Sequence, residues 1–142
     1  MNHLSDLLRN LTPMRLGSQW YFALCHHDTP FPKQPFLVLR EAQHCTVIFD
    51  AAQRAQWKTI EISEPMACIQ LGVASALHDV GLTAAVSQAL AAENISCNVI
   101  AAYQHDYLFV PAAQVERALT TLLGLSQAAS EHVSRAVSGG TP

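Results

Sequence analysis

The chain has 142 residues, which is enough for one domain or two very small ones and excludes a large multidomain enzyme. Half of the residues are hydrophobic and 13% are charged, so most of the chain must pack into a core rather than stay disordered. Eight scattered basic residues against eleven acidic ones give a formal charge of -3 without a basic stripe, which excludes nucleic acid as a partner. So apolar a chain is also expected to hide part of its surface against a second copy, in a homodimer.

Leucines spaced at i, i+3, i+4 and i+7 in the first eleven residues predict a short amphipathic helix that ends before Pro13. This segment contains charges and no long apolar run, so neither a signal peptide nor a membrane span is expected. The four cysteines lie far apart and form no CxxC pair, which favours buried, reduced thiols in a cytoplasmic protein.

Three β-rich runs follow the first helix, the first two separated by the proline-rich stretch 29–35. They lie at residues 20–25, 36–39 and 46–49. After the third run, Asp50 is placed to cap a helix from Ala51 to about Trp57. The front of the chain therefore predicts three strands and one short helix.

The rear of the chain predicts strand, helix, strand, strand, helix. These elements lie at residues 66–73, 82–93, 97–103, 107–110 and 115–123. Gly124 is placed to end the last helix, and the residues from Ser126 onward show no dependable pattern. We expect these last residues, 126–142, to form a tail.

The order of elements in the rear part, 66–125, is that of a ferredoxin-like unit without its last strand. Because no alternating apolar run follows Leu125, the missing strand must come from the front part, 1–65. We therefore predict two half-units that complete one another by strand exchange. They form one compact α/β sandwich, since no linker separates them.

The loop from Ser75 to Thr83 joins a strand to the start of a helix, a place where free backbone N–H groups and the helix dipole attract an anion. Gly81 allows a ligand to approach the backbone, while Asp79 and Asn98 offer groups that recognise an ammonium and a carboxylate. In the alternative interpretation, Gly81 only turns the chain and Asp79 caps the helix. No phosphate-binding or dinucleotide-binding motif is present, so a small carboxylate is the better ligand.

Histidines and aspartates cluster at two other places, 26–28 and 105–106, and His44 lies beside Cys45. Neighbouring residues of a strand point to opposite faces, so we expect His105 and Asp106 to form a turn between two strands rather than a catalytic pair or a metal site. No serine or cysteine has the setting of a nucleophile. We expect no catalytic residue, no metal and no cofactor.

The segment from Ile69 to Pro111, which contains LHDVGLTAAV and NVIAAYQHDYLFVP, resembles the ACT domain, the small-molecule regulatory module of amino-acid metabolism. It is most similar to stand-alone proteins related to the regulatory region of aspartokinase. The resemblance implies a ferredoxin-like α/β fold of two tandem βαββαβ units, with antiparallel sheets that carry their helices on one face. It also implies amino-acid binding at an interface between units, through the residues Ser75, Leu77, Asp79, Val80, Gly81, Leu82, Thr83, Asn98, Val99 and Ile100.

These observations lead to the hypothesis of a non-enzymatic, amino-acid-binding regulatory dimer that acts on a partner enzyme. Two alternatives stay open. One is a structural or protein-interaction module that keeps the fold without a ligand. The other is a metal protein or enzyme built from His26, His27, His44, His105 and Asp106.

Overall fold

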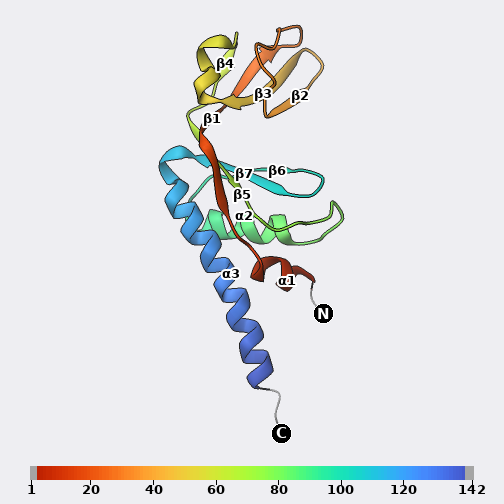
Figure 1. Ribbon diagram of the computed structural model, residues 1–142, viewed down its shortest axis with the longest axis vertical. Helices are drawn as coiled ribbons and strands as arrows, with labels where there is room; N and C mark the ends of the chain where they lie inside the picture. Colours follow the sequence, from red (N-terminus) through yellow and green to blue (C-terminus); the bar gives the residue numbers. More distant parts are fainter. Residues whose placement is uncertain (1–2, 140–142) are drawn as a thin grey trace.

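The computed structural model describes residues 3–139, which form one antiparallel, curled sheet with three α-helices among the described residues (Figure 1). The elements in chain order are α1 His3–Arg9, β1 Met14–His26, β2 Leu37–Arg40, β3 His44–Asp50, the 3-10 helix η1 Ala51–Gln56, β4 Glu61–Ile62, β5 Met66–Gln70, α2 Leu82–Ala92, β6 Asn98–Ala101, β7 Asp106–Pro111, the 3-10 turn η2 Ala112–Gln114 and α3 Val115–Ser138. The mixed α/β, ferredoxin-like fold is confirmed.

The long strand β1 connects the two parts of the sheet, whose strand order is β2-β3-β1-β5-β7-β6 (Figure 1). Its first residues pair with β5, from Met14 opposite Gln70 to Leu16 opposite Cys68. After an irregularity at Gly17, which has φ +60°, the same strand pairs with β3 and β4. A strand from the front of the chain therefore completes the rear sheet, as the element order predicted.

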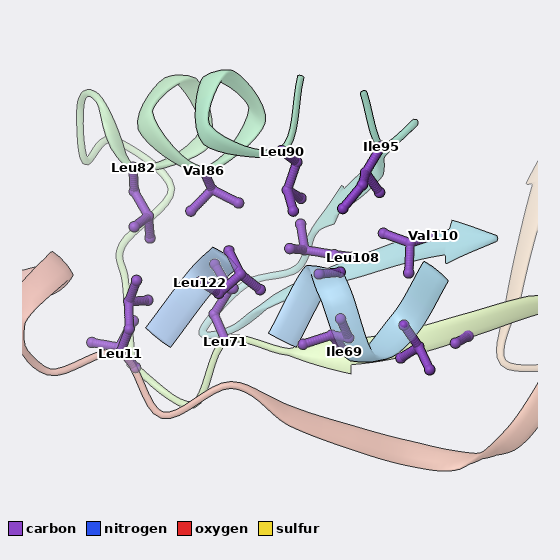
Figure 2. Packing of buried hydrophobic residues seen from close by; sticks show 14 of the residues in the cluster. Leu11, Ile69, Leu71, Leu82, Val86, Leu90, Ile95, Leu108, Val110 and Leu122 are labelled. Atoms are coloured by element: carbon purple, nitrogen blue, oxygen red, sulfur yellow. The ribbon is translucent and has the colours of Figure 1, made fainter. Parts of the chain in front are cut away.

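Alternation of side chains along the rear strands places the helices on one face of the sheet. Ile69, Leu71, Leu108 and Val110 point toward α2 and α3, where they meet the apolar stripes of those helices (Figure 2). Both faces of β5 are buried. On the side of the sheet without helices, Cys68 packs against Phe109 and other apolar side chains. Since each buried aliphatic side chain contributes about 1.5–3 kcal/mol, this two-sided burial holds the rear sheet in place.

The front part of the sheet is covered by the short 3-10 helix η1 instead of the α-helix expected at residues 51–57. Asp50 caps it as predicted, accepting a hydrogen bond of 2.8 Å from the backbone N–H of Ala52. The segment ends after six residues because Trp57 turns inward and stacks on Phe49, with ring centroids 5.1 Å apart. An aromatic side chain therefore covers this face.

The last helix does not end at Gly124: α3 continues to Ser138, through most of the predicted tail. Gly124 lies inside the helix and does not have the positive φ of a glycine that ends a helix. Beyond it, Ser126 donates a 3.0 Å hydrogen bond to the carbonyl of Arg9 in α1. The extension was missed because most residues after Ser126 are exposed, and the apolar residues that recur there at helical spacing are mostly alanines. Within residues 3–139 no helix has the length and apolarity of a transmembrane segment.

Replacing Gly124 by Ala tests the corrected helix. In the interior of an exposed helix, Gly→Ala raises the free energy of unfolding by about 0.5–1 kcal/mol. At a helix end with a left-handed residue, the same change lowers stability. Urea denaturation followed by circular dichroism measures the sign, and a loss of stability contradicts a continuous α3.

The turn after β5 depends on Gly72, which has φ +73° and accepts a 3.1 Å hydrogen bond from the Thr12 hydroxyl. A Cβ at this position would collide with the backbone of Thr12. Gly72→Ala is therefore expected to lower the free energy of unfolding by at least about 2 kcal/mol, from left-handed strain plus the collision. The same urea measurement applies, with Gly124→Ala as the matched control, and equal stability of Gly72→Ala and wild type contradicts this docking.

Candidate functional site

A small pocket of about 60 Å³ is lined by residues of the loop after β5, the start of α2 and the β6–β7 turn. Its lining contains five of the residues expected to bind a ligand, together with residues of the β6–β7 turn. The lining residues are Ser75, Ala76, Leu77, Asp79, Leu82, Thr83, Ala101, Ala102 and Asp106.

The start of α2 gives one wall of this pocket a positive character. Gly81 is the N-cap residue, has φ +103° and provides no side-chain acceptor for the first N–H groups of the helix. Leu82 is buried and points into the core, which fixes where the helix begins (Figure 2). Free N–H groups and the helix dipole together favour an anion such as a carboxylate at this end of α2.

The pocket is also lined by a negative group, the carboxylate of Asp106, which is only 6% exposed. Its Oδ2 accepts a 3.1 Å hydrogen bond from the hydroxyl of Ser75, and the backbone N–H of Ser75 donates to the carbonyl of Gln104 at 2.9 Å. The β5–α2 loop is thereby fastened to the β6–β7 turn. A buried carboxylate that lines a cavity is suited to bind a cationic group.

Sequence reasoning did not assign Asp106 to the site. It is the first residue of β7 and shares the helix-facing side of that strand with Leu108 and Val110, which are buried against α2 and α3. A carboxylate at i, followed by buried apolar residues at i+2 and i+4, is the signal that could have found it. Its partner Ser75 is 31 residues away, so spacing alone could not identify the pair.

Asp79 lines the pocket, but one of its carboxylate oxygens is bonded inside the loop and the other contacts α1. Oδ2 accepts a 2.6 Å hydrogen bond from the N–H of Ala76, and Oδ1 lies 3.0 Å from Nε2 of His3. The hydrogen bond from Ala76, followed by the interactions with His3 and His78, lowers the pKa of this carboxyl group. Asp79 therefore shapes the turn, and does not cap α2 through its side chain as the alternative interpretation expected.

The remaining predicted site residues, Asn98, Val99 and Ile100, lie on β6 and do not line the pocket of the same chain. Asn98 and Ile100 pair with Phe109 and Tyr107, on the helix-free face of the sheet. Val99 points to the helix side and packs against the rear core. Val80, which is 86% exposed, and Gly81, the N-cap residue of α2, also lie outside the lining.

The residues of the metal or enzyme alternative do not gather in one place. His26 and His44 are cross-strand partners with ring centroids 5.9 Å apart, at the far end of β1 from the turn that holds His105 and Asp106. Among the described residues no group of three or more His, Cys, Asp and Glu side chains is arranged to hold a metal ion. Burial raises the pKa of Cys68 to about 12, so this thiol is not activated as a nucleophile.

Comparison with known proteins relates part of this chain to a known family. Residues 61–123 match the family model of the ACT domain. A solved structure from Vibrio cholerae, of a protein of unknown function described as a possible transport protein, is 32% identical, with a TM-score of 0.70; the match covers 87% of this chain and 95% of that one. No protein of curated function is similar in sequence at a significant level.

Two more distant structures share the fold. A protein from Agrobacterium tumefaciens has a TM-score of 0.65 at 15% identity, and the match covers 82% of this chain and 89% of that one. The regulatory subunit of aspartate kinase from Thermus flavus has a TM-score of 0.62 at 12% identity, over 81% of this chain and 97% of that subunit. Residues 61–123 of the chain therefore belong to the ACT domain family, and the chain shares its fold with the regulatory subunit of aspartate kinase.

Proposed function

We propose that this protein is a non-catalytic regulatory module that binds an amino acid in the pocket between α2 and the β6–β7 turn. One observation carries the proposal: an uncapped helix N-terminus and a buried carboxylate line the same small cavity. The N–H groups at the start of α2 suit the ligand carboxylate, and Asp106 suits its ammonium group. Ser75 fixes the Asp106 carboxylate by its hydrogen bond.

The size of the pocket supports a shared site between two copies. A volume of about 60 Å³ holds only about two water molecules, at about 30 Å³ each, so it is too small to enclose an amino acid. A surface outside this chain must therefore enclose the rest of the ligand. Exposed apolar side chains belong to the loop and the turn that line the pocket, since Leu77 is 65% exposed and Tyr103, next to Ala102 of the lining, is 80% exposed. In the proposed homodimer these side chains are covered by the second copy.

Strand β6 is the natural place for that second copy, because it ends the sheet and leaves one edge of its backbone unpaired. Pairing there brings residues of a neighbouring copy toward the ligand. We propose that Asn98, Val99 and Ile100 contribute across this interface, although they do not reach the pocket of their own chain. The ligand then tightens the dimer, and the dimer acts on a partner enzyme.

A second candidate function is a structural or protein-interaction module that keeps the ACT fold without a ligand. The small volume of the pocket favours it. In that case the apolar rim around Leu77 and Tyr103 serves protein contacts only.

A thermal-shift screen of the twenty amino acids distinguishes the two candidates. A ligand at a hundred times its dissociation constant adds about 2.7 kcal/mol of stability, which raises the melting temperature by several degrees. Asp106→Asn keeps the shape of the side chain but removes its charge, so we expect the ligand-induced shift to fall by at least half.

The matched control is Glu41→Gln, which removes a carboxylate in the exposed β2–β3 turn. This variant should keep the full shift. If no amino acid raises the melting temperature of wild type, the structural module replaces the binding function. If Asp106→Asn shifts as much as wild type, the ligand does not use this pocket.

A further inference from the structure

Two of the four cysteines lie opposite each other in the front part of the sheet. Cys25 of β1 and Cys45 of β3 are cross-strand partners in the β1–β3 ladder, and both are free thiols. Their side chains lie on the same face and belong to the front core, where Cys25 is 0% and Cys45 1% exposed. The other two cysteines are kept apart, since Cys68 packs on the helix-free face of the rear sheet and Cys97 against the rear core.

The register of the ladder brings Cys25 and Cys45 within reach of a disulfide. On the other edge of β1, the carbonyl of Leu24 accepts a 2.7 Å hydrogen bond from the N–H of Ile60, so the backbone groups of Cys25 point toward β3. The two cysteines therefore form a hydrogen-bonded pair, in which Cα atoms lie about 5.5 Å apart, and disulfides span Cα distances of about 4.4–6.8 Å. Burial, and then the neighbouring Cys45, raise the pKa of Cys25, which is a second sign that the two sulfur atoms are close.

The cysteine pair lies one residue from the open end of its ladder. The last rung joins His26 to His44, and His26 is exposed. The thiol of Cys45 donates a 3.6 Å hydrogen bond to the carbonyl of His26, so opening this rung also frees the thiol. Strand ends open at a far lower free energy than the whole fold, so a small oxidant reaches the pair without global unfolding.

We propose that Cys25 and Cys45 are a redox modification site, at which a small peroxide forms a reversible disulfide. One thiolate attacks the peroxide and breaks its O–O bond; the sulfur becomes a sulfenic acid, and the other oxygen leaves as an alcohol or as water. The second thiolate then attacks this sulfur, the S–S bond forms, and the sulfenic oxygen leaves as water. The two thiols lose two electrons and two protons in all, and the peroxide takes them up.

The disulfide closes a covalent ring around the proline-rich loop and β2, because both lie between the two cysteines in sequence. The Cβ atoms of cross-strand partners are about 4.5–5.5 Å apart, whereas a disulfide needs about 3.5–4.5 Å. The two strands must therefore draw together, and the bond that results is strained and is easily reduced by small thiols. Such a bond switches the rigidity of the front part of the sheet and is not a permanent crosslink.

Treatment of the folded protein with hydrogen peroxide, followed by mass spectrometry without reduction, tests the site. We expect the wild-type chain to lose two hydrogen atoms and two of its four free thiols, and to regain them with dithiothreitol. Trypsin places Cys25 in peptide 16–33 and Cys45 in peptide 41–54, so the disulfide joins these two peptides.

Cys25→Ser and Cys45→Ser should each abolish the loss of hydrogen atoms, while the matched control Cys97→Ser should keep it. Peptide mapping of wild type needs no variant, so it remains decisive where a serine variant fails to fold. A disulfide that involves Cys68 or Cys97 appears on peptide 59–117, which contains both, and overturns the proposal. So does a bond between two chains, the addition of oxygen without an S–S bond, or a full count of free thiols after peroxide treatment.

Discussion

The pairing of one strand with two partners is the constraint on which the structure depends. The first residues of β1 form a ladder with β5, and the later ones, from Trp20 to His26, form a ladder with β3. Gly17 lies in the irregular stretch of the β5 ladder between Leu16 and Trp20, and its left-handed φ of +60° lets the strand shift register there without the steric cost of a Cβ. Without β1, the backbone of β5 would lose its hydrogen-bond partners on that side, and β3 would lose its central neighbour.

The same strand anchors the pocket through the residues that precede it. Thr12 holds the beginning of the β5–α2 loop at Leu71 and Gly72. Helix α1 supports its end, because His3 contacts Asp79 and a Cβ at Gly81 would lie 2.8 Å from the Leu4 side chain. The N-terminal segment thus shapes a loop that is some seventy residues away in sequence. Local sequence can predict this loop, but only long-range contacts determine its form.

This difference explains what the sequence predicted and what it missed. The borrowed strand was predictable because a strand-helix-strand-strand-helix order leaves one place in a ferredoxin-like sheet empty. Asp106 was missed because its importance depends on Ser75, a contact across 31 residues. Asn98 was correctly placed at the head of a strand, yet its pairing with Phe109 turns it to the face opposite the pocket. In the extension of α3 the apolar residues at helical spacing are mostly alanines, so the periodicity was too weak to reveal the helix.

The rear pocket takes its character from the helix and the turn that line it. It lies against the N-terminus of α2, so its positive side comes from backbone N–H groups, while buried Asp106 supplies the negative charge. A ligand enclosed by two copies couples its affinity to their association, and this coupling is reciprocal. In the proposed arrangement the rear pocket therefore reports effector concentration as a change in assembly.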